Sequence, residues 1–403
     1  MHILIIARGI PTKQSPQWGI FEYDQAKALA KLGHKVTIAS VDSRFGAYKR
    51  KIGLTCGEQD GVRFYNYFLC PSAITGLFGQ TFQNKIKKWQ WQQLVKAICQ
   101  KEDKIDVIYS HYLFNSYYAV TFLRHLNIPI VAIEHWSEIN KPKLLPSIQK
   151  KGEEVYPKVD QLLTVSKAAQ SALKRHFNQD SIVVYNMVNS DIFKYLNCEH
   201  TSNKIKFIAT GSLIHRKGYD LLIDAFAKLQ LPASKWELNI IGTGIEHDNL
   251  AKRISDANLT ENIHLLGSRT ANEIATILNQ ADVFVLPSRM ETFGVVYIEA
   301  LACGLPVIAT PCGGPEEFIT KQNGLLVPTE DVEALSEAIK QMFYHHQEYN
   351  RKAIANDCKA RFSSEVIAKQ LTDIFEDVIR KKINRKELKT VRNSSQPLSS
   401  HNN

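Results

Sequence analysis

The sequence predicts an α/β protein built from two facing Rossmann-like domains, each a doubly wound parallel sheet, with a cleft between them. Short apolar segments alternate with amphipathic ones along both halves of the chain, a pattern typical of parallel sheets covered by helices on both faces. The length of 403 residues is also too great for one ordinary core and suits two domains of about 200 residues each.

In residues 1–195, the expected first domain, a helix over Phe21–Leu32 stops at Gly33, where the next strand begins. Five short apolar segments of this half are predicted strands: His2–Ala7, Lys35–Ser40, Ile105–Ser110, Pro129–Glu134 and Gln161–Ser166.

Residues 196–345, the expected second domain, repeat the alternation more clearly, after a polar boundary near Asp191–Asn203. Its predicted strands are Lys206–Thr210, Glu237–Ile241, Ile263–Leu266, Val283–Leu286, Val307–Ala309 and Gly324–Val327, with helices such as Asp220–Leu229, Ala271–Asn279 and Val295–Leu301 between them. We expect helices over 346–380 that cross back to the first domain. Residues 381–403 read as a basic, disordered tail, because they are polar and lack an apolar pattern.

Composition and charge exclude several classes of protein. No stretch reaches the roughly 20 apolar residues of a membrane span, and seven scattered cysteines without a Cys-x-x-Cys pair favour a reducing cytoplasm over a zinc site. No Asp-x-Asp is present, so a metal-held diphosphate of the kind that motif supports is not expected. No nucleic-acid module is recognisable, so nucleic acid is not an expected partner.

The net charge of +10 is unevenly placed: residues 1–195 carry +11, residues 196–379 carry −7 and the remainder +6. An anionic membrane surface or an anionic acceptor is one partner that fits the basic first half. A merely solvated surface is the alternative. Within this half, the basic segment 80–98 with Trp89 and Trp91 fits either an interfacial helix or an ordinary helix packed on its domain.

In open α/β sheets, ligands bind beyond the carboxyl ends of the strands, so polar residues there are candidate site residues. Arg216 and Lys217, in a loop that ends at Gly218, can offer two cations to a diphosphate. Gly294 opens a helix whose N-terminus suits a phosphate. Glu291 precedes that helix, and Glu299 lies in its apolar run, where a carboxylate needs a partner such as ribose hydroxyls.

Three further groups occupy equivalent places. Gly313 and Gly314 form a tight turn whose N–H groups can face a sugar or phosphate. Gly19 follows the first strand, and His111 and His135 each end a strand of the first half. Both histidines can therefore point into the predicted cleft. A single histidine at a strand end is more often structural than catalytic, but two at equivalent topological positions favour a role in the site.

Together these clusters resemble the retaining glycosyltransferases of family 4, which have the GT-B fold. The resemblance is carried by Glu291 and Glu299 as a Glu-x7-Glu element, by the Lys217–Gly218 loop, by the Gly313–Gly314 turn and by the segment around Asn186. It is strong over residues 204–330 and weaker over 1–190. One departure is Ser212, where many members have arginine, a place that Arg216 can fill.

The resemblance implies a role for each matching residue. Lys217, helped by Arg216, neutralises the leaving diphosphate, and Glu299 binds the ribose. Glu291 lies by the donor sugar, with the backbone N–H groups of Phe293, Gly294 and Val295 near sugar and phosphate. Gly19 lets the first, acceptor-side domain approach the diphosphate, and His135 lies at the reaction centre. His111, Asn186, Gly313 and Gly314 are expected on the acceptor or sugar side.

The expected protein is therefore a cytoplasmic transferase, peripheral on the inner face of the cytoplasmic membrane if the basic segment docks there. It uses a UDP- or GDP-sugar, no divalent metal and no cofactor, and a glycan or lipid-linked acceptor. A sugar-nucleotide epimerase of the same architecture and a non-catalytic sugar-nucleotide-binding protein remain alternatives, distinguished by whether product forms only when an acceptor is supplied.

Overall fold

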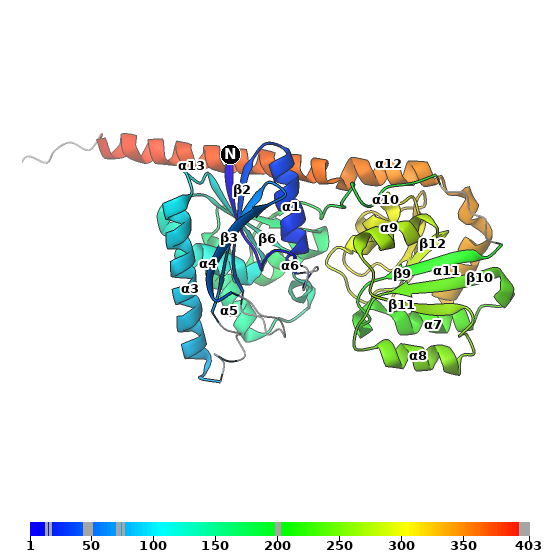
Figure 1. Cartoon of the computed structure of the whole chain (residues 1–403). Coiled ribbons are helices and arrows are strands. Elements are labelled where there is room, and N and C mark those ends of the chain that lie inside the picture. Colours follow the sequence, from blue (N-terminus) through cyan, green and yellow to red (C-terminus); the bar gives the residue numbers. More distant parts are fainter. Residues whose placement is uncertain are drawn as a thin grey trace, which may run out of the picture.

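The computed structural model describes residues 1–12, 15, 18–42, 51–69, 74, 77–197 and 203–394. Figure 1 shows two α/β bodies side by side, joined along one side by helices α12 (Arg351–Phe362) and α13 (Ser364–Ser394). The predicted two-domain α/β architecture with parallel sheets is confirmed.

The first domain holds a sheet of eight strands among the described residues, in the order β3-β4-β2-β1-β5-β6-β7-β8. The strands are β1 (His2–Ile6), β2 (Lys35–Asp42), β3 (Gly53–Gln59), β4 (Val62–Phe68), β5 (Val107–His111), β6 (Ile130–Glu134), β7 (Gln161–Thr164) and β8 (Ile182–Val183). The five predicted strands are present with ends shifted by up to two residues.

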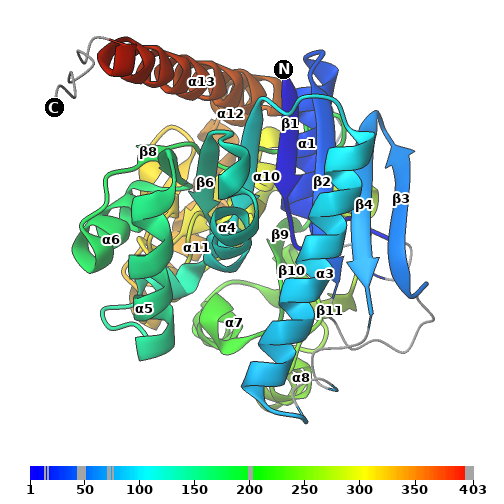
Figure 2. The ribbon, with the colours of Figure 1, turned by 90° about the vertical axis from the view of Figure 1, so that its left-hand side faces the viewer.

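The strands β3 and β4 form a hairpin that we did not predict, and β3 runs antiparallel to β4, which makes this sheet mixed. The turn consists of Asp60 and Gly61, both with positive φ (52° and 74°), as a two-residue hairpin turn requires. The hairpin extends the sheet on the side of β2 (Figure 2).

Helices cover both faces of this sheet because neighbouring residues of a strand point to opposite sides. Ile3 and Ile5 of β1 belong to a core shared with α1 and α13, whereas Leu4 and Ile6 belong to one shared with α3 and α4. The helices of this domain are α1 (Ile20–Lys31), α3 (Gln80–Lys101), α4 (Tyr112–Phe122), α5 (Pro146–Val155) and α6 (Lys167–Phe177).

The second domain has a parallel sheet in the order β11-β10-β9-β12-β13-β14. Its strands are β9 (Ile205–Thr210), β10 (Trp236–Ile241), β11 (Ile263–Gly267), β12 (Val283–Leu286), β13 (Val307–Ala309) and β14 (Gly324–Leu326). Its helices are α7 (Tyr219–Ala227), α8 (His247–Asp256), α9 (Ala271–Asn279), α10 (Val295–Ala302) and α11 (Val332–His345). The central strand β12 is wholly buried, as an apolar run covered on both faces must be.

The C-terminal helices return to the first domain. The backbone N–H of Val188 donates to the carbonyl of Phe362 (2.8 Å), and the ring of Phe375 in α13 lies edge-on to Tyr109 of β5 at 5.0 Å. Farther along, Lys382 contacts Asp160. The helix α13 continues to Ser394, so residues 381–394 are helical where we expected a disordered tail, because a helix already anchored by packing extends more easily than one that must nucleate.

Candidate active site

The centre of the second domain's site is an ion pair between Lys217 and Glu291. Lys217 ends the short 3-10 helix η4 (His215–Lys217), and its Nζ lies 2.6 Å from Oε1 of Glu291. The two side chains are only 11% and 7% exposed, and Ser288 Oγ also donates to Glu291 Oε1 at 2.8 Å. A buried ion pair is costly to desolvate, so its presence at a strand end favours a functional role over a stabilising one.

Two neighbours shape this loop. Gly218, with φ 71°, lies so close to Pro287 that a Cβ there would come within 2.1 Å of the Pro287 carbonyl oxygen. Only glycine therefore lets the loop after β9 pack on the loop after β12. Arg216 reaches the first domain, where its Nη1 donates to Ser137 Oγ (2.9 Å).

Glu299 lies in the second turn of α10, and its side chain is half-buried. Within the described part of the chain, no group donates a hydrogen bond to its carboxylate. Burial raises the pKa of Glu299 to about 8, with a further rise from nearby Asp24 of α1 and an opposing effect of Lys217. Lys217 and Glu299 are therefore on the same side of the molecule, and Glu299 is available to accept from a ligand.

Gly294 opens helix α10, as the sequence predicted. Gly294 adopts φ 90° and ψ 65° at the N-cap, without a side-chain cap, so the first N–H groups of the helix are not satisfied by a capping side chain. Phe293 is buried beside Tyr185 of the first domain (5.6 Å between rings), and Val295 begins the helix.

The Gly313–Gly314 turn differs from the expectation that its N–H groups are open to a ligand. Both N–H groups donate to the carboxylate of Glu316, at 3.0–3.1 Å. An acidic side chain three residues on competes for the same donors that an anion would use. A bound sugar or phosphate would have to displace the exposed Glu316 side chain.

In the first domain, the two predicted histidines touch. Nδ1 of His111 lies 3.1 Å from Nε2 of His135, and the rings are parallel within 3° at a centroid distance of 5.2 Å. Burial lowers the pKa of both histidines, that of His135 to about 4. A side-chain hydrogen bond with Asn186 has the opposite, smaller effect on the pKa of His135. We predicted His111 on the acceptor or sugar side, but its side chain is wholly buried, so it contacts His135 and is not open to an acceptor.

Three residues that we did not predict lie near the histidine pair: Arg8, Glu22 and Tyr112. Arg8 follows β1 and forms a two-point ion pair with Glu22 of α1 (2.7 and 3.0 Å), and its guanidinium lies 4.4 Å from the ring of Tyr112. Tyr112 has φ 68°, a strained value for a bulky residue, and its ring lies 5.1 Å from His135. The sequence carries no motif for this trio, because Arg8 and Glu22 are 14 residues apart and meet only in the folded domain.

Gly19 is the N-cap of α1 with φ 71°. A Cβ at this position would come within 2.2 Å of the Gly9 carbonyl oxygen. The structure thus explains the need for glycine by close backbone approach inside the first domain, and contact with a diphosphate stays a prediction.

The segment after His135 connects the two groups of residues. The 3-10 helix η2 (Ser137–Asn140) receives Arg216 at Ser137, and Asn140 Nδ2 donates to the backbone carbonyl of Glu291 (3.2 Å). Glu317 of the second domain accepts from the backbone N–H of Lys167 (2.6 Å) and from Tyr185 (3.2 Å). Only four residues of the chain, 136–139, therefore separate His135 from Asn140, which contacts Glu291.

The described residues include neither a metal-binding cluster nor a membrane-spanning helix. No group of three or more His, Cys, Asp or Glu side chains gathers as a metal site would require. Within the same ranges, no helix has the length and apolarity needed to span a bilayer. The metal-independent chemistry stays a prediction.

Two α/β domains, one with a parallel sheet and one with a largely parallel sheet, meet at the carboxyl ends of their parallel strands. A buried cation and carboxylates on one side and histidines on the other define an enzyme of the GT-B class. A family model for "Glycosyltransferase Family 4" matches residues 21–192, and one for "Glycosyl transferases group 1" matches residues 197–359.

An uncharacterised glycosyltransferase of Methanocaldococcus jannaschii is 30% identical over 69% of this chain and 77% of its own length. The chain belongs to family 4 of the glycosyltransferases, with the GT-B fold. The Bacillus subtilis protein TuaC, named as a teichuronic acid biosynthesis glycosyltransferase, is 25% identical over 94% of this chain and 99% of its own.

Among solved structures, Anabaena HepE in complex with UDP and glucose superposes with a TM-score of 0.72, covering 94% of this chain and all of that one at 19% identity. Membership of a transferase family weighs against the epimerase alternative.

Proposed function

We propose that this glycosyltransferase is a retaining, metal-independent enzyme that moves a hexose or N-acetylhexosamine from a UDP- or GDP-sugar to a glycan or lipid-linked acceptor. Synthesis of a bacterial surface polysaccharide, such as a capsule or lipopolysaccharide, is the role we assign to it. The observation that carries the proposal is the buried Lys217–Glu291 pair beside the half-buried Glu299, whose carboxylate has no donor among the residues that the structure describes.

The proposed chemistry follows from where the charges lie. As the bond from the sugar's anomeric carbon to the diphosphate lengthens, negative charge grows on the leaving group and the sugar becomes oxocarbenium-like. Lys217 and Arg216, with the uncapped N-terminus of α10, supply positive charge at this place without a metal ion. Glu299 accepts from the ribose hydroxyls and Glu291 orients the sugar.

On the other domain, His135 faces the sugar and is uncharged at neutral pH, because burial lowers its pKa to about 4. A neutral imidazole can hydrogen-bond to a sugar hydroxyl without repelling the developing oxocarbenium. Retention is proposed to occur by attack from the same face as the leaving group. The relatives lend support: HepE was solved with UDP and glucose, and TuaC is named for teichuronic acid biosynthesis.

A donor panel tests this proposal. UDP- and GDP-hexoses and N-acetylhexosamines are incubated with the enzyme and a membrane extract as acceptor, with and without EDTA. We expect nucleoside diphosphate to be released only when acceptor is present, equally with EDTA, and the product to keep the donor's anomeric configuration by NMR. Isomerisation of a donor without acceptor would indicate an epimerase, and binding without turnover of any donor a binding protein; either result refutes the proposal.

The surface of α3 supports an anionic membrane as a further partner of the first domain. The structure divides this helix: Trp91, Leu94 and Ile98 are buried in the core, as in an ordinary packed helix, whereas Phe82 and Trp89 are each 42% exposed. Leu77 and Phe78, just before it, are 84% and 69% exposed. The 22 residues of α3 include no acidic residue and five lysines.

This combination fits an anionic bilayer, since aromatic side chains insert at the interface and lysines meet lipid phosphates. We expect the enzyme to co-sediment with vesicles of phosphatidylglycerol and phosphatidylcholine, and less so as salt increases. Phe82→Ser with Trp89→Ser should abolish co-sedimentation. The matched control is Tyr344→Ser, which removes a 60% exposed aromatic ring from α11 of the second domain. Equal binding by all three proteins would refute membrane docking through α3.

A further inference from the structure

Glu134, the last residue of β6, is a buried carboxylate that the proposed chemistry leaves without a role. It is 1% exposed, and four donors fill its oxygens. Oε1 accepts from the backbone N–H groups of His135 (2.9 Å) and Trp136 (2.8 Å). Oε2 accepts from the backbone N–H of Leu113 (2.9 Å) and from the hydroxyl of Tyr156 (2.8 Å).

These donors come from the two places where the chain leaves the sheet toward the proposed reaction centre. His135 and Trp136 follow β6, and Leu113 lies in the first turn of α4, directly after β5. The strands β5 and β6 are parallel neighbours, with His111 opposite Ile133. One carboxylate therefore holds both turns in a fixed relation to each other.

The two turns that Glu134 holds also carry the rings of His111, Tyr112 and His135. Leu113 follows Tyr112, whose left-handed φ of 68° needs support from its surroundings. The three rings belong to residues at or next to these N–H groups in the sequence. The His111 and His135 rings share a 3.1 Å contact, and the Tyr112 ring lies against His135. A change in the relation of the two turns would change the place of all three rings.

We propose that Glu134 is a positioning residue for His135: by binding the backbone on both turns, it fixes the histidine pair and the orientation that the His135 ring presents to the sugar. This inference rests on the proposed function for the importance of that orientation. The fixing of the pair itself is independent of any activity.

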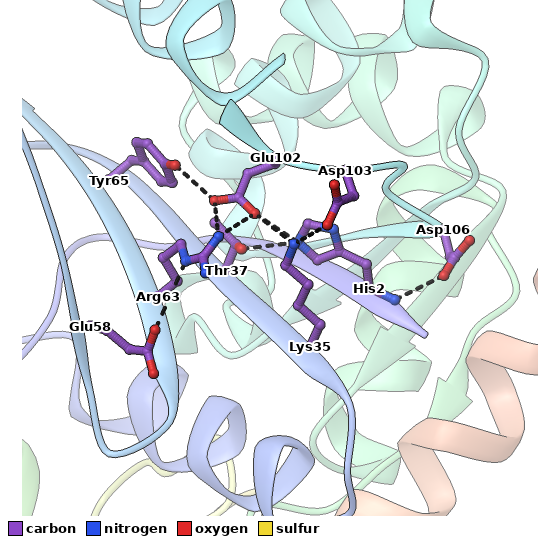
Figure 3. Close-up of polar contacts among 9 residues, drawn as sticks. All are labelled: His2, Lys35, Thr37, Glu58, Arg63, Tyr65, Glu102, Asp103 and Asp106. Carbon is purple, nitrogen blue, oxygen red and sulfur yellow. Dashed lines mark hydrogen bonds and ion pairs between the residues drawn. The ribbon is translucent and has the colours of Figure 1, made fainter. Parts of the chain in front are cut away.

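A second buried carboxylate separates this role from ordinary stabilisation. Glu102 lies at the opposite, amino-terminal edge of the same sheet, next to His2 and Lys35, which begin their strands (Figure 3). Its side chain is fully buried and accepts from Arg63 (3.0 Å) and Tyr65 (2.7 Å), with Lys35 at 3.2 Å. Glu102→Gln removes a comparably bonded carboxylate and touches neither histidine.

The test uses the full-length protein labelled with ¹⁵N in its histidine side chains. A proton shared between His111 and His135 is shielded from water and should give a slowly exchanging ring N–H signal, which His111→Ala assigns by its loss. We expect the signal in the wild type and in Glu102→Gln. In Glu134→Gln, whose amide turns an N–H₂ group toward two donors, it should exchange at least tenfold faster or vanish.

Thermal unfolding of the same proteins shows whether each variant is folded, and we expect both glutamine variants to melt below the wild type. Should Glu134→Gln not fold, Tyr156→Phe carries the test, since it removes one donor to Glu134 and keeps the backbone ones; a shifted signal is then expected. An unchanged signal in a folded Glu134→Gln, or in Tyr156→Phe if that variant decides, overturns the inference. So does loss of the signal in Glu102→Gln to the same extent.

The two proposals fail separately. If the signal responds as expected but His135→Ala transfers sugar at the wild-type rate, Glu134 still fixes the pair and the place of His135 in the reaction is wrong. If the signal does not respond and His135→Ala is inactive, the place of His135 in the reaction stands and the positioning role of Glu134 is wrong.

Discussion

Replacement of Lys217 by methionine removes the positive charge on which the proposed mechanism depends most. The loss of one preorganised positive group from a buried site costs about 3–4 kcal/mol of transition-state stabilisation, which is a fall of roughly 10²–10³-fold in turnover. The side chain is 11% exposed, so water cannot replace the ammonium group efficiently. The decrease should appear in kcat, because the charge it opposes grows only as the diphosphate leaves.

The same change also leaves the carboxylate of Glu291 buried without its cation. Breaking a buried ion pair costs about 3–5 kcal/mol of stability, and we expect the lower end because Ser288 still donates to Glu291. Lys217→Met combined with Glu291→Gln removes both charges and should recover most of the melting temperature. Turnover should stay low, which separates folding from catalysis.

Release of nucleoside diphosphate from the best donor of the panel, measured as kcat and KM, is the assay. Lys228→Met is the control, since Lys228 forms an exposed ion pair with Glu333 elsewhere on the second domain and its loss should change neither quantity. A double variant that transfers sugar at more than about a third of the wild-type rate would refute the role given to Lys217. Loss of a few kcal/mol of transition-state stabilisation must lower the rate far more than about threefold.

Three further outcomes follow from other parts of the molecule. Because the pKa of Glu299 is raised to about 8, its carboxylate is mostly protonated at neutral pH and ionises as pH rises; UDP binding by calorimetry should therefore strengthen between pH 6.5 and pH 9, after subtraction of the profile of Glu299→Gln, and a profile identical in both proteins would contradict this. Trp91→Ala should lower stability by about 3–5 kcal/mol in denaturant unfolding, as loss of a buried aromatic side chain does, whereas Trp89→Ala should cost less than about 1 kcal/mol; equal losses would show that the helix faces are misassigned. Gly218→Ala should lower both stability and donor affinity, since its Cβ would meet the Pro287 carbonyl oxygen at 2.1 Å; wild-type melting and affinity in this variant would show that the two loops do not need that contact.

Much of the fold could be predicted because apolar runs such as Val283–Leu286 are wholly buried and leave little choice but a central parallel strand. The hairpin β3–β4 was missed because β3 has no buried residue and both strands are mixed in polarity. Asp60–Gly61 between the two strands is a signal for a hairpin turn and could have found it.

The site was predictable where chemistry is local in sequence and not where it depends on packing. Lys217 and Glu291 each lie at a strand end, and the fold brings them to 2.6 Å. The occupation of the Gly313 and Gly314 N–H groups by Glu316 depends on the exact course of a short turn. The Arg8–Glu22 pair and the support of two turns by Glu134 join residues through tertiary contacts that no spacing in the sequence reveals.

The histidine pair shows the same limit from another side. Two strand-ending histidines indicated a common place, and the structure brings them into contact. Which of them faces outward depends on the layers around them: the buried ring of His111 lies against Tyr109, and Tyr109 in turn packs on Phe375 of α13. A contact across more than 200 residues of sequence cannot be read from either motif.

A crystal structure of the enzyme with UDP, or with GDP if the donor panel selects it, tests the central claim most directly. We expect Nζ of Lys217 and the guanidinium of Arg216 to contact the diphosphate, the N-terminus of α10 to point at it, and Glu299 to accept from the ribose. A nucleotide bound away from Lys217, or a diphosphate that contacts neither this lysine nor Arg216, would contradict it.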